Sequence, residues 1–492
     1  MTAETVYLRL RTTDPSRWHA LAAAWRRWAT LAGHLAAELP PLLARFAGAW
    51  SGTAARAATD RLHRLGRGLA VFRVLCWQAD QAISEFATSL DRARALLSRA
   101  AAAAARGGLT IADDGTLRGG PSAAVTPDLT AALTAADRAD ATAVAGLSFG
   151  PAEPPGPARP SCTATPAEVH RWWSGLTPGE QRWLLATEPG WLAPLDGIPA
   201  ADRDAANRLL FDDRRVRPAA AHGVQHGLDT LTDTLASEDG PRAYLLRLDT
   251  SGEGRVVVAL GDPDRAGNVL THVPGMTSDL ASFNGELTRA ARVAARATEV
   301  DPAASTSAVL WLDYDAPDFV DEAASAGQAT RAAPALSRFQ EGLRAGHQAG
   351  PAHQTVVGHS YGSLVVGRAA ASGENLADEV VFVGSPGVGV NSAAQLHAPP
   401  GHVWSSTSGS DVIQYAAVSP RGLAEELTRA GFGVVEPERH LWFGENPSDP
   451  QFGARVFASR PGGGHLGYWD PGSRSLDALA AITLGRPPVD NG

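Results

Sequence analysis

The sequence predicts an α/β chain, in which a mainly parallel β-sheet carries helices on both faces and is preceded by an all-α hairpin. After residue 240, short apolar runs typical of strands alternate with stretches of helical periodicity. Before residue 107, apolar residues recur at alternating steps of three and four, the period of helices that pack along each other. The 492 residues are enough for roughly two to four folding units.

Composition excludes several classes of protein. Apolar residues make up 44% and charged residues 19%, which suits a packed core and not a disordered chain. The net charge of −9 disfavours nucleic-acid binding. Cys76 and Cys162 match neither a disulfide framework nor a metal motif, and no apolar run reaches the roughly 18 residues of a membrane span. The first residues lack the basic and apolar regions of a Sec signal peptide.

Residues 1–106 predict an antiparallel helical hairpin. Pro40-Pro41 should interrupt its first helix, because proline lacks an N–H donor and clashes with the preceding turn. Trp50-Ser51-Gly52 lies between the two helical patterns, where the glycine can take the turn conformation. The segment carries a net charge of +8 and the rest of the chain −17. Either this is simply an arginine-rich helical surface, or the segment docks onto an acidic surface such as the chain's own C-terminal half.

The hairpin resembles the WXG-type proteins of type VII secretion in its length, its two helices and the Trp50-Ser51-Gly52 turn. The tyrosine and acid that usually end such proteins are not evident near 86–91. The resemblance implies a protein partner and export by a type VII-like route. The alternatives are a plain hairpin used for dimerisation or self-docking, and a cytoplasmic location.

The middle of the chain predicts two smaller units. Residues 107–165 contain a small β-hairpin around Asp114-Gly115, an alanine-rich helix at 126–146 and a proline-rich linker. Residues 166–240 are helical again and are expected to pack on the domain that follows, which spans 241–492. In that domain we expect strands at 244–248, 255–260, 268–273, 308–312, 355–358, 379–383, 403–406 and 455–458, and helices at 280–298, 330–348, 362–372 and 474–484.

The motif Gly358-His359-Ser360-Tyr361-Gly362 lies where a buried strand ends and a helix begins. A sharp turn at this point leaves no room for side chains on either side of the serine, which explains the flanking glycines. It also lifts the hydroxyl to the carboxyl edge of the sheet and directs the helix N-terminus at developing negative charge. The sequence therefore predicts Ser360 as a nucleophile.

A nucleophilic serine needs a histidine base and an acid that orients it, in the chain order serine, acid, histidine for this kind of turn. Asp411 follows the second strand after the turn, and His465 lies on a glycine-rich loop before the last helix. The other histidines precede the last strand or lie within the turn, and the other acids lie at the wrong edge or in an insertion; these are His359, His397, His402, His440, Glu374, Asp378, Glu379 and Asp449.

The oxyanion of an acyl-transfer intermediate should be held by two backbone N–H groups. We expect the first from Tyr361 and the second from Met276, where Gly275 lets the backbone approach the substrate. Residues 313–315 are expected to shape the pocket. The length of the segment 412–453 suggests a lid.

Residues 243–485 resemble an α/β-hydrolase of the lipase/esterase type. The longer run from Trp172 resembles an actinobacterial hydrolase family of unassigned function, through the stretches 195–200, 273–276, 358–362 and 465–469. The resemblance implies the α/β-hydrolase fold and a serine nucleophile, but no particular substrate.

The sequence thus predicts a serine hydrolase of the carboxylesterase or lipase type that cleaves ester or related acyl bonds through an acyl-enzyme intermediate. Its expected substrate is a small-molecule or lipid ester, with no cofactor and no metal. A peptidase or acyltransferase with the same triad is an alternative. The other alternative is an interaction protein whose hydrolase domain no longer reacts.

Overall fold

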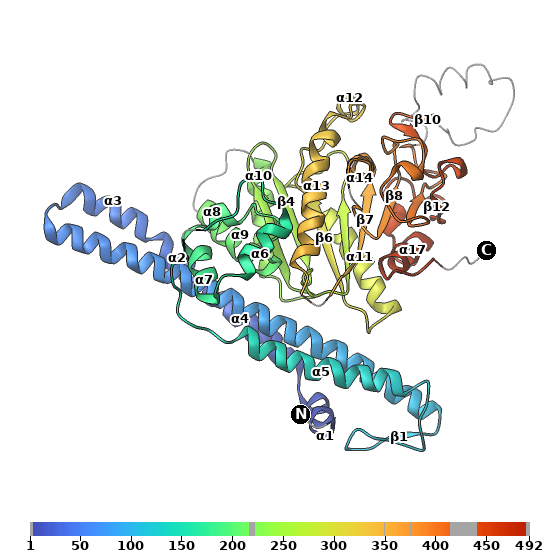
Figure 1. The fold of residues 1–492 in the computed structure, drawn as a ribbon, viewed down its shortest axis with the longest axis horizontal. Coiled ribbons are helices and arrows are strands. Elements are labelled where there is room, and N and C mark those ends of the chain that lie inside the picture. The colour runs from blue at the N-terminus through green and yellow to red at the C-terminus, as the bar shows by residue number, and fades with distance from the viewer. Residues whose placement is uncertain are drawn as a thin grey trace.

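The computed structural model describes residues 3–156, 158–215, 222–348, 350–373, 375–413 and 440–488. Its centre is an eight-stranded sheet in the order β12-β9-β8-β7-β5-β6-β4-β3 (Figure 1). The strands are β3 Ala243–Asp249, β4 Arg255–Leu260, β5 Asn268–Val273, β6 Thr306–Leu312, β7 His353–His359, β8 Glu379–Val383, β9 Val403–Ser406 and β12 Arg455–Val456. Every strand expected in the second half of the chain is confirmed.

The sheet is parallel from β6 through β5, β7, β8 and β9 to β12. Only β4, which lies between β3 and β6, is antiparallel to both of its neighbours. In the parallel part, the carboxyl ends of β5, β7, β8 and β9 therefore meet at one edge. The loops that follow these strands are the ones that carry the expected site.

Helices cover both faces of the sheet, as expected for a fold in which helices connect parallel strands. Strand residues alternate between the two layers, because successive side chains point to opposite faces. One set, which includes Leu270, Val357 and Val381, packs with α11 (Phe283–Val300) and α17 (Arg474–Thr483). The other set, which includes Val356 and Val380, packs with α13 (Gly327–Gly346) and α14 (Tyr361–Ala371).

The N-terminal region forms a long helical arm made of α2 (Pro15–Ala37), α3 (Leu39–Ala49), α4 (Thr53–Arg106) and α5 (Thr126–Gly146). Pro40 and Pro41 lie in the first turn of α3, where their missing N–H groups are not needed, and the break between α2 and α3 falls just before them. α5 packs along α4, so the middle segment contributes a helix to the arm. Figure 1 shows the arm passing beneath the sheet, with α3 at the end that projects away from it.

The arm packs against the rest of the chain through an apolar cluster and ion pairs. Val74 and Trp77 of α4 share a buried cluster with Trp173, Leu184 and Leu209.

Charged contacts also join the arm to the rest of the chain. Asp80 of α4 lies 2.8 Å from Arg242, which also pairs with Asp204 at 2.8 Å, and all three side chains are buried. Arg27 of α2 pairs with Glu238 at 3.0 Å. A buried charge must keep its partners, because removing one of them leaves an uncompensated ion in a medium of low dielectric constant.

Within 166–215 and 222–240, the structure describes five helices beside the sheet: α6 Pro166–Ser174, α7 Pro178–Thr187, α8 Pro189–Leu192, α9 Ala200–Arg215 and α10 His222–Ala236. Thr165 and Thr177 each accept a hydrogen bond from the backbone of a glutamate three residues later, which caps α6 and α7 reciprocally. The remaining short elements are α1 Ala3–Thr12, β1 Thr110–Ile111, β2 Leu117–Arg118, α12 Val320–Ala323, η1 Ala393–Gln395, β10 His440–Leu441, β11 Gly444–Glu445, η2 Pro450–Phe452 and η3 Gly467–Trp469.

Across the residues that the structure describes, we find no helix with the length and apolar character needed to cross a bilayer.

Candidate active site

Ser360 lies in the turn between β7 and α14, at the carboxyl edge of the sheet. Its backbone has φ 52° and ψ −129°, a conformation that a residue with a side chain rarely adopts. The two flanking glycines have no room for a side chain. A Cβ on Gly358 would lie 2.5 Å from the Cα of Ser363, and a Cβ on Gly362 would lie 2.2 Å from the carbonyl oxygen of Val273. The glycine pattern is therefore a steric requirement of this turn.

A second residue with a strained backbone, Thr277, lies on the loop after β5. Within the described part of the chain, only Ser360 and Thr277 combine a side chain with positive φ, and Thr277 has φ 63°. Thr277 is β-branched and directly follows Met276, and its N–H donates to the carbonyl oxygen of Pro317 at 2.9 Å. Residues in sparsely populated backbone conformations cluster at functional sites, because the surroundings must hold them there.

The loop after β5 approaches the serine closely. A Cβ on Gly275 would lie 2.6 Å from the Cβ and 3.1 Å from the Oγ of Ser360. Tyr314 supports this loop, since its hydroxyl donates to the carbonyl oxygen of Pro274 at 2.6 Å. The backbone beside Met276 therefore lies next to the serine, where the sequence placed the second oxyanion donor.

Tyr361, the first residue of α14, has its side chain turned away into the core. Its hydroxyl donates to the carbonyl oxygen of Ser325 at 2.6 Å. The first N–H groups of a helix have no partner within the helix, so the backbone N–H of Tyr361 is the group available at this site. The side chain therefore leaves the backbone N–H as the part of Tyr361 that could hold an oxyanion, and that role stays a prediction.

His465 and Asp411 form a close pair. The imidazole Nδ1 of His465 donates to the carboxylate of Asp411, with both oxygens at 2.9 Å. Asp411 is fully buried, and it also accepts from the hydroxyl of Tyr468 at 2.7 Å and from the N–H of Ile413 at 2.9 Å. Burial alone would raise the pKa of Asp411, but the hydrogen bond and charge of His465, with the two other donors, lower it below its usual value.

The end of β8 brings the serine and the His465–Asp411 pair together. The N–H of Ser360 donates to the carbonyl oxygen of Val383 at 3.0 Å. The next residue, Gly384, has φ 56°, and a Cβ there would lie 2.8 Å from Oδ2 of Asp411 and 3.2 Å from Nδ1 of His465. The backbone of Ser360 and the His465–Asp411 pair thus lie at the same strand end, although the three residues are far apart in the chain.

His359, the residue before the serine, lies behind His465. The two rings are 4.7 Å apart, and Nε2–H of His359 donates to the backbone carbonyl oxygen of His465 at 3.0 Å. Burial lowers the pKa of His359 to about 3, and the nearby His465 contributes to the shift. His359 is therefore neutral at pH 7 and supports the loop of His465 as a hydrogen-bond donor.

A second histidine lies beyond His359. His272 stacks on His359 with 6.5 Å between ring centres, and its Nε2 lies 2.9 Å from a carboxylate oxygen of Glu286. Burial opposes the ionisation of Glu286, but the hydrogen bond and charge of His272 outweigh it and lower the pKa of Glu286 to about 2. The ionised carboxylate accepts a hydrogen bond from Nε2–H of His272, which fixes the orientation of that ring.

Two of the alternative histidines have partners of their own. His402 pairs with Glu379 at 2.8 Å, and His440 pairs with Glu445 at 3.1 Å, so each has an acid of its own. Of the expected lid, residues 414–439 lie outside the described residues. Its described end carries Phe443, whose ring meets that of Tyr361 edge-on at 6.1 Å.

Sequence reasoning missed three supporting residues of this site: His359 as a support of the His465 backbone, Tyr468 as a donor to Asp411, and Gly384 as the residue that makes room for the pair. Gly384 follows a buried strand, which is a readable signal for a close approach of backbone. The tyrosine and histidine contacts depend on how the loop before α17 folds back, and the sequence carries no signal for that.

Among the residues described by the structure, no three histidine, cysteine or acidic side chains are arranged to hold a metal ion.

Comparison with known proteins agrees with this architecture. A family model described as "Alpha/beta hydrolase" matches residues 249–420, a range that contains Ser360, Asp411 and both expected oxyanion residues and ends before His465. An uncharacterized protein of Mycobacterium tuberculosis is 29% identical over 403 residues, which are 72% of this chain and 61% of that protein. The chain thus spans about three fifths of that relative's length.

A shorter relative is matched over more of its length. An uncharacterized protein of Mycobacterium bovis is 34% identical to this chain over 234 residues, which are 46% of this chain and 79% of that protein. The chain therefore belongs to an α/β-hydrolase family of mycobacterial and related proteins. The eight-stranded sheet, with helices on both of its faces, agrees with this assignment.

Proposed function

We propose that the protein is a serine hydrolase that cleaves small-molecule or lipid esters through Ser360, His465 and Asp411. One observation carries the proposal. The strained Ser360 shares the end of β8 with a histidine whose Nδ1 faces a fully buried carboxylate at 2.9 Å. With Nδ1 turned to Asp411, the Nε2 of His465 is the nitrogen left to act as a base.

The reaction then follows the chemistry of an activated serine. Nε2 of His465 takes the proton of the Ser360 hydroxyl while Oγ bonds to the ester carbonyl carbon. The negative charge that develops on the carbonyl oxygen is held by the N–H groups of Tyr361 and Met276. His465 returns the proton to the leaving alcohol, and a water molecule activated in the same way releases the acid and restores Ser360.

Asp411 has two roles in this scheme. Its carboxylate keeps the proton of His465 on Nδ1, and its negative charge stabilises the imidazolium that forms during each step. Because its pKa is lowered, Asp411 is ionised in the folded protein near neutral pH. His465 can act as a base only when its imidazole is unprotonated, which is the state that accepts the hydroxyl proton of Ser360.

The experiment is a hydrolysis assay with p-nitrophenyl esters of increasing chain length. Ser360→Ala should abolish turnover, and Ser372→Ala, at the exposed end of the same helix, should leave it unchanged. Amide and thioester substrates, and an alcohol offered as acyl acceptor, separate an esterase from a peptidase or an acyltransferase. Turnover that survives in Ser360→Ala would remove Ser360 as the nucleophile, and no turnover of any acyl substrate would favour the unreactive interaction protein.

For the N-terminal arm we infer self-docking onto the hydrolase region in preference to a separate role. The support is the buried group of Asp80, Arg242 and Asp204, together with the apolar cluster around Trp77. Asp80→Asn should loosen the arm and increase the rate at which a protease cuts between residues 107 and 165. An unchanged cleavage rate would argue against self-docking.

A further inference from the structure

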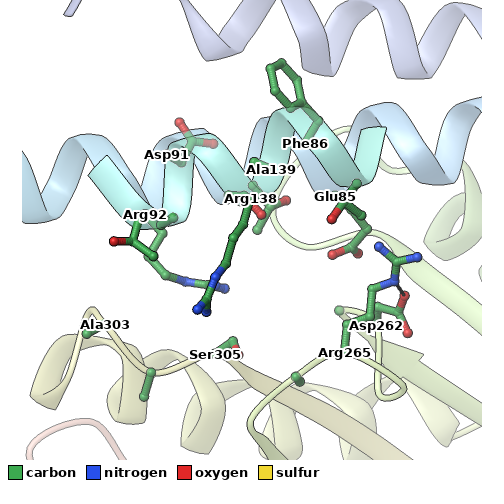
Figure 2. A pocket seen from close by; sticks show the side chains of 18 of the residues that line it. Glu85, Phe86, Asp91, Arg92, Arg138, Ala139, Asp262, Arg265, Ala303 and Ser305 are labelled. Atoms are coloured by element: carbon green, nitrogen blue, oxygen red, sulfur yellow. Dashed lines mark ion pairs between the residues drawn. The ribbon is translucent and has the colours of Figure 1, made fainter. Parts of the chain in front are cut away.

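A cavity of about 1630 Å³ lies between the arm and the hydrolase region, far from the candidate active site (Figure 2). One wall is formed by α4 and α5. The other wall is formed by segments that precede β5 and β6, around Asp262–Ala266 and Pro302–Thr306. These segments lie at the amino ends of the parallel strands, whereas Ser360 lies at the carboxyl ends. The cavity is therefore on the opposite edge of the sheet.

Most charges along the cavity already have a partner. Asp262 lies 3.5 Å from Arg265, and Asp91 pairs with His19 at 2.7 Å on the side of α4 that faces away from the cavity. Arg242 is held by Asp80 and Asp204, as described above. Each of these groups is already satisfied by a neighbour within the protein.

Two arginines of the cavity lack such a partner among the described residues. Arg92 of α4 and Arg138 of α5 make no ion pair or hydrogen bond with any residue that the structure describes. Figure 2 shows both guanidinium groups extending into the same open space, toward the loop that carries Ala303 and Ser305. Two like charges that converge in a partly enclosed space repel each other unless an anion lies between them.

The remaining acid of the cavity, Glu85, offsets this charge only in part. Its carboxyl accepts a hydrogen bond from Tyr244 at 3.0 Å. Burial, with the charge of Asp262 close by, raises the pKa of Glu85 to about 7, so a large fraction of it is neutral at physiological pH. The cavity consequently holds an excess of positive charge around Arg92 and Arg138.

We propose that this cavity binds a small molecule that carries a phosphate or carboxylate group, with Arg92 and Arg138 holding the anion between them. Guanidinium groups form two parallel hydrogen bonds to such oxyanions, so two of them can enclose one group. The helical wall also carries apolar side chains, among them Ala95, Leu96 and Ala135. They leave space for an apolar body attached to the anion.

Occupancy would tie the arm to the hydrolase region, because the ligand touches helices of one and loops of the other. The proposal stands apart from the ester chemistry at Ser360. It requires no reaction, and it is tested by binding alone.

Titration calorimetry and thermal unfolding of the full chain test it, with inorganic phosphate and n-butyl phosphate as probes. We expect saturable binding and a rise in Tm with each probe. Arg92→Gln and Arg138→Gln should each weaken binding by about ten- to hundredfold, the loss expected for a charge-assisted hydrogen bond. Arg67→Gln, an exposed arginine of α4 outside the cavity, should leave binding unchanged.

The ratio of the two affinities distinguishes the sources of the anion. Tighter binding of n-butyl phosphate indicates an organic ligand whose body lies along the alanine-rich wall, and equal binding indicates free phosphate; both support the anion site. Absence of saturable binding, or binding that both arginine variants retain, overturns it.

The stability of the variants without a probe is an independent check. Removing one of two repelling charges should leave Tm equal or higher. A clear fall in Tm would mean that the arginines are structural and would count against the proposal.

Discussion

The buried histidine beside the nucleophile makes a quantitative prediction about stability and pH. Folding lowers the pKa of His359 from the ordinary 6.5 to about 3, because its ring is enclosed and lies next to His465. As pH falls below about 6.5, the unfolded chain takes up a proton at this position and the folded chain does not. The folded state therefore loses stability as pH falls from about 6.5 toward about 3.

The size of the effect follows from the shift. One pKa unit corresponds to about 1.4 kcal/mol, so His359 should cost the folded state roughly 2 kcal/mol at about pH 5, and about 4 kcal/mol once the folded pKa is reached. The variant His359→Gln cannot take up this proton but keeps an N–H donor for the carbonyl of His465. It should therefore gain roughly 2 kcal/mol relative to the wild type between about pH 7.5 and about pH 5.

Urea unfolding at several pH values measures this difference directly. Glu286 and Asp411, whose pKa values folding lowers, also destabilise the fold in acid, but both remain in the variant and titrate mainly below pH 5. His397→Gln, at an exposed position, controls for the loss of an imidazole and should run parallel to the wild type. Parallel curves for His359→Gln would refute the reasoning, because they would mean that this ring can be charged in the folded protein.

Three further substitutions test the site. Asp411→Asn should lower kcat/KM for p-nitrophenyl butyrate about 10⁴-fold, since His465 loses the carboxylate that orients it, and a loss below about tenfold would remove Asp411 from the scheme. Tyr468→Phe deprives the buried Asp411 of a donor, so urea unfolding should show a loss of about 1–3 kcal/mol; an unchanged midpoint would mean that the hydroxyl bond contributes nothing. Gly384→Ala puts a methyl 2.8 Å from Oδ2 of Asp411 and should reduce kcat at least about tenfold, whereas Gly401→Ala, with positive φ but open surroundings, should leave kcat intact. Equal kcat values for the two glycine variants would contradict this crowding.

Local signals in the sequence were sufficient for most of the fold. The strands from 244 to 406 are short apolar runs bounded by turn residues, and each is present in the sheet. The sharp turn at Ser360 could also be predicted from a local signal. The two glycines that the turn requires lie within two residues of the serine in the sequence. The position of His465 followed from the order of elements alone.

The parts that sequence reasoning did not reach depend on contacts between distant segments. The arm packs against the hydrolase region through Asp80 and Arg242, which are 162 positions apart, and no periodicity marks either residue as a partner. The hydrogen bond from His359 to the carbonyl of His465 crosses 106 positions and depends on a loop conformation. The cavity beneath the sheet exists only because α5 lies beside α4 above the loop that carries Ser305.

The central claim is that His465, held by Asp411, activates Ser360. Reaction with a fluorophosphonate probe, followed by mass spectrometry of the labelled peptides, tests it most directly, because such a probe reports the nucleophilicity of a serine without any assumption about the natural substrate. We expect a single label on Ser360, formed at least about a thousandfold more slowly in a folded His465→Gln variant. A label on another residue, or equal labelling rates of Ser360 with and without His465, would contradict it.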